Sequence, residues 1–310
     1  MEERSAIAER LFVCRLRAII YRMNILPQLF LNGLIAGSIY ALMALGFNLI
    51  YRTTKFFNLA HGAMAVIGGY AVFYLAKQLG WNIVLSSALG VLVTGCAGYL
   101  LYGFIFSPMI KRKASNMVLL VASLGVFTAI QALIAIFFTS QFQSLDLSNG
   151  VQRTYALLGG IVTLPQLIIF ASVVVVSLAL ALLLRLTLFG KAVKAISDDE
   201  EVAKIVGIHT EKIAGWVFFI GSAIAGLAGI LCGFDIGIEP TRGLSLLLKG
   251  VIAVIIGGAG NLWGGIIGAL LLGLAENFGI WKISGEWQDV IAFSVLLLVL
   301  LVRPQGIFKQ

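Results

Sequence analysis

The chain has 310 residues, of which 60% are hydrophobic and 12% are charged, with 22 basic and 14 acidic side chains. Soluble proteins average about 25% charged residues, so this composition excludes a disordered chain, a secreted disulfide scaffold and an ordinary cytosolic enzyme. We therefore predict a multi-pass protein of the cell membrane, in which the net charge of +8 reflects basic residues retained on the cytoplasmic side.

Apolar runs that are free of charge recur along the whole chain. A helix needs roughly 20 such residues to cross about 30 Å of hydrocarbon. Lipid cannot satisfy a free backbone amide, and the runs lack the alternation of an outer-membrane barrel, so we expect all of them to be helical. In chain order they are residues 27–51, 56–76, 82–107, 114–145, 154–184, 213–234, 250–275 and 290–302.

The basic connections predict the orientation of the chain. Residues 52–55, 111–113 and 185–212 are separated by two spans each, so all three connections can be cytoplasmic. Residues 1–24 hold five arginines and would then have to be exported, which the same rule disfavours. We hypothesise that translation begins at Met23; in a longer chain, residues 7–21 are expected to form an interfacial amphipathic helix. Residues 25–310 are expected to form one transmembrane domain.

Polar residues are rare within the apolar runs, and the notable group is Asn58, His61 and Gly62 at the start of the second run. The plain interpretation of His61 is a neutral, hydrogen-bonding residue at a helix break, and the alternative is a titrating switch. No charge pair or proton relay is expected within the spans. Many of the 35 glycines lie four residues apart, as Gly33 and Gly37 do, which predicts close helix packing.

Residues 188–212 form the longest charged connection and are predicted to be a cytoplasmic loop that contains one short surface helix. Ser197 and Glu200 have the spacing of a capping box, and Gly207 can end the helix. Three apolar residues then share one face of the helix: Val202, Ile205 and Val206. Such a face suits docking into the groove of a partner, and the alternative is a solvated connector.

The stretch 244–279 is too long for one comfortable crossing and is interrupted by Gly257, Gly258, Gly260 and Asn261. We expect two short helices here, which makes nine spans and returns the C-terminus to the cytoplasm; a single tilted helix would make eight. The glycines are expected to serve packing, and the alternative is that the broken segment lines a pathway or moves. The predicted fold is an all-α polytopic membrane bundle of about 8–9 transmembrane helices with a broken glycine-rich segment.

The sequence contains none of the residue patterns that enzymes and metal sites require. It has no phosphate-binding loop, no Ser/His/Asp arrangement and no cluster of metal ligands. Cys14, Cys96 and Cys232 lack metal-ligand spacing and are predicted to be unpaired thiols. We therefore expect a non-catalytic subunit that binds no cofactor or metal, with any ATP dependence supplied by another subunit.

From about residue 26 to 308 the chain resembles the permease subunits of ATP-binding-cassette importers for branched-chain amino acids. The elements that carry the resemblance, in order, are Leu31-Asn32-Gly33-Leu34, Gly37-Ser38-Ile39-Tyr40-Ala41-Leu42, Asn58-Leu59-Ala60-His61-Gly62, Gly68-Gly69-Tyr70, residues 190–208, Gly237-Ile238-Glu239-Pro240-Thr241 with Gly243, Lys249-Gly250, Gly257-Gly258-Ala259-Gly260-Asn261 and Arg303-Pro304-Gln305-Gly306. Related urea and amide permeases share much of this pattern.

The resemblance implies that Glu201-Val202-Ala203, with Gly207 six residues after Glu201, is the family's motif for docking on the ATPase, with Val202 in place of an alanine. The residues expected to couple the chain to the ATPase are Ser197, Asp198, Glu201, Val202, Ala203, Ile205, Val206 and Gly207.

The resemblance further implies the partners: a second homologous permease, two cytoplasmic subunits that hydrolyse ATP, and an extracytoplasmic binding protein that delivers leucine, isoleucine or valine. Alternating access would be driven by the ATPases. A urea or amide permease of the same family remains an alternative, and a self-contained channel or secondary carrier is the alternative of another class.

Overall fold

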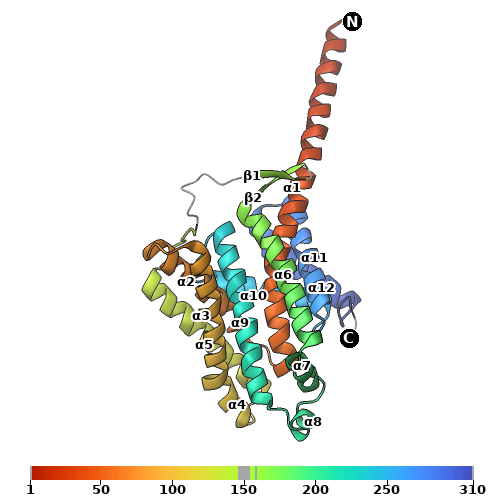
Figure 1. Cartoon of the computed structure of the whole chain (residues 1–310). Coiled ribbons are helices and arrows are strands. Elements are labelled where there is room, and N and C mark those ends of the chain that lie inside the picture. Colours follow the sequence, from red (N-terminus) through yellow and green to blue (C-terminus); the bar gives the residue numbers. More distant parts are fainter. Residues whose placement is uncertain (1, 146–153, 158, 309–310) are drawn as a thin grey trace.

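The computed structural model describes residues 2–145, 154–157 and 159–308, with side chains described from residue 25 onward. Helices make up most of the described chain, which also contains a single two-stranded sheet and the connecting segments (Figure 1). The elements are α1 (Glu2–Thr54), α2 (His61–Val72), η1 (Phe73–Gln78), α3 (Ile83–Leu101), η2 (Tyr102–Phe106), α4 (Ser107–Lys111), α5 (Asn116–Phe138), β1 (Thr154–Leu157), β2 (Gly160–Thr163), α6 (Leu164–Leu186), α7 (Leu188–Asp198), α8 (Glu200–Ile205), α9 (Thr210–Asp235), α10 (Arg242–Gly257), α11 (Leu262–Ile280), η3 (Gly285–Trp287) and α12 (Gln288–Val302).

Seven helices of the described chain are long and apolar enough to cross a membrane. Two shorter helical segments lie in the same bundle, namely α2 with its continuation η1, and the 16-residue α10. At about 1.5 Å per residue, α10 is long enough to reach most of the way through the hydrocarbon layer. The expected fold class, a membrane bundle of about 8–9 helices, is thus confirmed, and the protein is a multi-pass protein of the inner membrane.

The helices divide into a buried centre and a lipid-facing periphery. Most of the apolar part of α1 and α9 is buried within the chain, whereas α5, α6 and α12 leave most of theirs uncovered. Apolar side chains are as stable in lipid as against another helix, so their exposure on the periphery is expected of a membrane protein. The centre therefore depends on close backbone packing more than on large side chains.

Glycines bring the central helices into backbone contact, as their spacing predicts. A Cβ atom placed on Gly37 of α1 would lie 2.8 Å from the Cα of Leu270 in α11. A Cβ on Gly68 of α2 would lie 2.5 Å from the carbonyl oxygen of Gly226 in α9. Neither backbone atom can move aside as the end of a side chain can, so these positions require glycine.

Replacing Gly68 by valine is expected to destabilise the protein by about 1–3 kcal/mol, because the new side chain must separate α2 from α9. The matched control is Gly125→Val in α5, where a Cβ would meet nothing within 4 Å. Thermal unfolding in detergent and the amount of protein in the membrane provide the measurement. Equal stability of the two variants would contradict the assignment of Gly68 to helix packing.

Two expectations about regular structure are wrong. Residues 154–163 do not begin a span: β1 and β2 form an antiparallel hairpin in which Thr154 lies opposite Thr163. Gly159 has a φ of +85° in the turn, and α6 begins only at Leu164, where the Gln166 side chain accepts a hydrogen bond from the Thr163 amide at 3.0 Å. The run 114–145 is likewise helical only from Asn116 to Phe138.

The backbone of residues 2–24 continues α1 without a break, and Figure 1 shows this part projecting beyond the bundle. It is one helix with the first span, so a separate interfacial helix over residues 7–21 is not seen in the described backbone. The proposed start at Met23 and the domain boundary before residue 25 stay predictions.

Candidate functional site

The predicted coupling segment forms two helices, not one, so the expected cap at Ser197 is wrong. Ser197 lies in the last turn of α7, and Asp199 caps α8 instead, since its carboxylate accepts hydrogen bonds from the amides of Glu201 (2.8 Å) and Val202 (3.0 Å). Val193 and Ile196 of α7 are buried. Their burial favours a helix that continues through Ser197, where the predicted surface helix was expected to begin. Aspartate and serine are equally good N-caps, so the burial of Val193 and Ile196 determines which of the two caps the helix.

The apolar face predicted for α8 is present and uncovered among the described residues. Val202, Ile205 and Val206 are 53%, 83% and 68% exposed, while Ala203 is buried to one side of this face. Glu201 lies at the exposed surface beside them. Gly207 ends the helix with a φ of +88° and donates its amide to the Lys204 carbonyl at 3.0 Å. The role of this face in docking stays a prediction.

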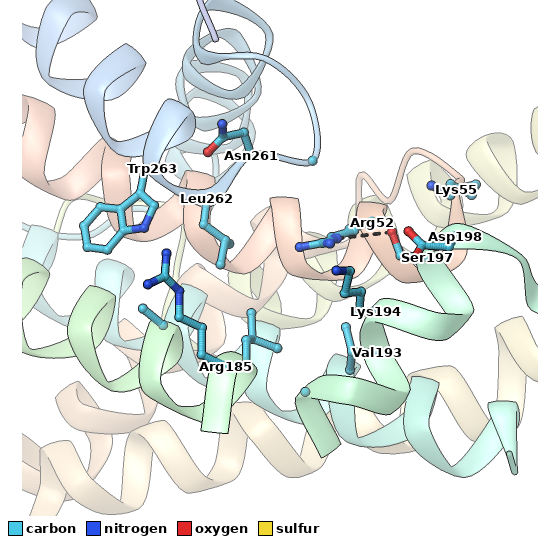
Figure 2. A pocket seen from close by; sticks show the side chains of 14 residues that line it. Arg52, Lys55, Arg185, Val193, Lys194, Ser197, Asp198, Asn261, Leu262 and Trp263 are labelled. Atoms are coloured by element: carbon cyan, nitrogen blue, oxygen red, sulfur yellow. Dashed lines mark hydrogen bonds between the residues drawn. The ribbon is translucent and has the colours of Figure 1, made fainter. Parts of the chain in front are cut away.

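A cavity of about 500 Å³ lies between α7 and the ends of α1 and α6 (Figure 2). It brings together two groups that the sequence analysis predicted separately, Ser197 and Asp198 of the coupling segment and Gly260 and Asn261 of the helix break. The Arg52 Nε donates to the Ser197 Oγ at 3.1 Å, which ties α7 to the end of α1.

Basic side chains dominate the lining of this cavity. Four of them surround it, against the single acid Asp198: Arg52, Lys55, Arg185 and Lys194. Within the described chain none of the four forms an ion pair. Such a gathering of basic residues agrees with the cytoplasmic orientation predicted for this end of the bundle.

The glycine-rich break separates two helices, α10 and α11, as expected. Asn48 of α1 holds it from the side: its Oδ1 accepts from the Gly260 amide at 2.8 Å, and its Nδ2 donates to the Asn261 carbonyl at 3.0 Å. Asn261 in turn caps α11 by accepting from the Gly264 amide at 3.1 Å. The φ angles of Gly258 (+102°) and Gly260 (+94°) suit glycine. Protein side chains thus satisfy part of the broken backbone, as an interrupted helix in a membrane bundle requires.

The C-terminal residues return to this same break. The amides of Ile307 and Phe308 donate to the carbonyls of Ile256 and Gly257 at 2.8 and 3.2 Å. The expectation of two short helices that return the C-terminus to the cytoplasmic side agrees with this arrangement, because the break lies beside the basic cavity.

The segment from Asn58 to Gly62 precedes and opens α2. The Asn58 Oδ1 accepts from the Ala60 amide at 3.1 Å, and a Cβ on Gly62 would lie 2.6 Å from the Gly243 carbonyl oxygen. His61 is fully buried, and its ring occupies the space that the missing side chain of Gly46 leaves. Its ring lies against the backbone of Met43, so the expected hydrogen-bonding role stays a prediction.

The expectation that the spans hold no charge pair is wrong. The Nζ of Lys249 in α10 lies 3.3 Å from the Oε2 of Glu276 in α11. These two residues flank the uncharged run 250–275, and they meet because the chain folds back at the break between α10 and α11. Opposite charges at the two ends of an apolar run with a central helix break are the signal that could have predicted the pair.

Three donors converge on Glu276, whose side chain is 0% exposed. The Tyr40 hydroxyl and the Gln288 Nε2 each donate to its Oε2 at 2.7 Å, and the Lys249 Nζ completes the set. Lys249 also donates to the Tyr40 hydroxyl at 3.2 Å and lies 3.4 Å from Asp289 Oδ1. A second cavity, of about 490 Å³, opens beside these side chains.

Comparison with known proteins identifies related sequences along nearly the whole chain. The family model described as "Branched-chain amino acid transport system / permease component" matches residues 29–300. The chain is 32% identical over 297 residues to the high-affinity branched-chain amino acid transport system permease protein LivH of Escherichia coli K12, covering 92% of this chain and 96% of that protein. It is 31% identical to the corresponding protein BraD of Pseudomonas aeruginosa, covering 91% and 95%.

Among solved structures, the chain resembles one from PsaBC of Streptococcus pneumoniae in complex with Fab, with a TM-score of 0.52 at 14% identity. The match covers 88% of this chain and 91% of that one, and at this identity it supports the fold alone.

Proposed function

The chain belongs to the family of branched-chain amino acid transport permease components, and from that premise we propose that it carries leucine, isoleucine and valine across the membrane as one subunit of an ATP-driven importer. Its partners would be a second homologous permease, two cytoplasmic ATPases and an extracytoplasmic binding protein. The chain itself would bind no cofactor, since ATP is hydrolysed on the partner subunits.

The exposed apolar face of α8 is the observation that carries this proposal. Val202, Ile205 and Val206 are more than half exposed at the end of the bundle where basic residues gather. Exposed apolar side chains on a charged surface helix are typical of a partner interface. We infer that an ATPase docks on this face, and that the charged ends of α7 and α8 stay in water around it.

A chain of contacts connects this face to the helix break. The short helix α8 follows α7 directly, and Ser197 of α7 is bonded to Arg52 of α1. One turn earlier on α1, Asn48 holds Gly260 and Asn261 of the break. We infer that movement of the ATPases on ATP binding displaces α7, shifts the end of α1 and changes the break, so that the pathway alternates between its two openings.

Uptake by a bacterial strain that lacks its own importers tests the proposed function. The strain receives this chain with its partner permease, ATPases and binding protein, and the uptake of labelled leucine and labelled urea is measured. We expect leucine uptake that is lost when an ATPase carries an inactivating substitution in its phosphate-binding loop.

Two other outcomes would contradict the proposal. Urea uptake in the absence of leucine uptake would show that the chain is a urea or amide permease of the same family. Leucine uptake by this chain without the ATPases would make it a self-contained channel or secondary carrier.

A further inference from the structure

We propose that the 490 Å³ cavity beside Lys249 is a binding site for the charged head group of an α-amino acid on its way through the membrane. The inference rests on the proposed function for the class of ligand, and it goes further by naming the side chains that hold the two charges. Lys249 would bind the carboxylate, and Asp289 the ammonium group.

The first argument is the burial of the charge pair. The side chains of Glu276 and Lys249 are 0% and 10% exposed, on helices that lie in the membrane bundle. Taking two charges out of water is costly, and apolar residues of similar size often serve stability as well or better. Ionisable residues within a membrane bundle are rare, and those that face a cavity are typical of ligand or ion pathways.

The second argument is that Glu276 and Asp289 bind Lys249 in different ways. Glu276 lies beneath it and is fixed by Tyr40 and Gln288, so it positions the ammonium group without lining the cavity itself. Asp289 is different: it lines the cavity, and its side chain is 64% exposed. Its distance of 3.4 Å from Lys249 is longer than the distances from Lys249 to Tyr40 and Glu276. Exposed ion pairs contribute little stability, so a ligand can replace this contact readily.

A zwitterion fits between Lys249 and Asp289 because it supplies the charge that each of them loses. Its carboxylate takes the place of Asp289 beside Lys249, and its ammonium group pairs with the released Asp289. A ligand with only a carboxylate places a second anion beside the unpaired Asp289, and a ligand with only an ammonium group places a second cation beside the largely buried Lys249. The pair therefore distinguishes α-amino acids from simple acids and amines.

The rest of the cavity suits the remainder of such a ligand. Its volume lies within the range of small-molecule sites, about 300–1,000 Å³. Ile236, Leu246 and Cys232 provide apolar surface for a side chain, and Ser245 and Thr241 provide hydroxyl groups. Three further charged residues line the cavity: Glu239, Arg242 and Glu286. Arg242 and Glu239 neutralise each other at 3.3 Å.

The cavity also lies on the side of the bundle from which an importer receives its substrate. It is lined by the first half of α10 and the start of α12, whereas the far end of α10 reaches the break beside Asn48 and the basic cavity. A ligand bound at Lys249 thus has entered from the end of the bundle away from the coupling segment. It has yet to pass the helix break on its way to the cytoplasm.

Protection of an introduced thiol tests this site directly. Ser245→Cys is placed in a chain whose three native cysteines are replaced by alanine. The complete transporter is reconstituted in vesicles and treated from outside with a charged maleimide. We expect leucine to slow the labelling, while 4-methylpentanoate, which lacks the ammonium group, and 3-methylbutylamine, which lacks the carboxylate, do not.

Substitutions then show whether Lys249 and Asp289 cause this protection. Lys249→Gln is expected to raise the leucine concentration for half-protection roughly tenfold or more, and Lys249→Arg to preserve it. Lys282→Gln removes an exposed charge outside the cavity and is the matched control. If Lys249→Gln fails to fold, Asp289→Asn at the exposed side of the cavity is expected to weaken protection in the same way.

Protection by all three compounds alike, or protection unchanged in both Lys249→Gln and Asp289→Asn, would overturn the proposed site and leave the charge pair a structural one. Leucine uptake without any protection would also overturn the site, but not the proposed function. Protection by other α-amino acids in a wild-type transporter that fails to import leucine would support the site and overturn the branched-chain assignment.

Discussion

Substituting Gly207 by proline is expected to lower leucine uptake by roughly tenfold or more while the protein remains in the membrane at its normal level. Proline is fixed near a φ of −65°, whereas Gly207 has a φ of +88°, and proline also removes the amide that donates to Lys204. Strain of about 1–3 kcal/mol at this point would displace the end of α8, and with it Ile205 and Val206. Uptake of labelled leucine per amount of membrane protein is the measurement.

Gly80→Pro is the matched control for this variant. Gly80 has a similar φ of +69° and lies in the connection between η1 and α3, away from α8, with nothing within 4 Å of a Cβ there. It introduces comparable strain without touching the coupling segment, so uptake is expected to be nearly normal. Glu201→Lys, which reverses a charge on α8 without straining the backbone, is expected to lower uptake as well. Normal uptake by both Gly207→Pro and Glu201→Lys would refute the coupling role.

Substituting Asn48 by leucine is expected to reduce both stability and uptake. Asn48 is buried and pairs with a backbone amide and a backbone carbonyl of the break, at Gly260 and Asn261. Leucine leaves the Gly260 amide and the Asn261 carbonyl without their partner, which costs about 1–3 kcal/mol for each group that stays out of water. The midpoint of thermal unfolding in detergent and leucine uptake are the two measurements.

Asn32→Leu is the matched control, because Asn32 lies on the same helix and, among the described residues, its side chain accepts a hydrogen bond from the Gln28 side chain one turn away and touches no backbone of the break. Asn48→Asp keeps the acceptor for Gly260 and loses the donor to Asn261, so an intermediate effect is expected. If Asn48→Leu behaved like Asn32→Leu in both measurements, the break would not depend on α1, and the proposed path from α7 to the break would lose its central link.

Short-range patterns predicted much of the coupling segment but not its boundaries. The alternation of apolar and charged residues correctly placed Val202, Ile205 and Val206 on one exposed face, and a glycine was correctly expected to end α8. The start of the helix was wrong, because both Ser197 and Asp199 satisfy the local rules for a cap. The burial of Ile196 against the rest of the protein decided between them, and burial is not a local property.

The hairpin of β1 and β2 shows where hydropathy alone assigned the wrong secondary structure. Residues 154–163 are apolar enough to have been assigned to a span, since hydropathy records only whether a segment tolerates an apolar environment. Their structure depends on the turn at Gly159 and on the start of α6 at Leu164. Burial of Val162 and contact of β2 with α1 then fix the hairpin on the bundle.

The sequence by itself determined that the protein lies in a membrane, and it determined the approximate number of helices, the family and the glycine positions where helices pack. Hydropathy and residue spacing are properties of a single helix, so they can be obtained from the sequence. Only the tertiary structure decided which distant residues meet. Lys249 and Glu276 are 27 positions apart and form a pair because the chain reverses at Gly257–Asn261, and Tyr40 reaches them from another helix. Contacts of this kind depend on how helices are arranged in space, and each helix carries that information only in part.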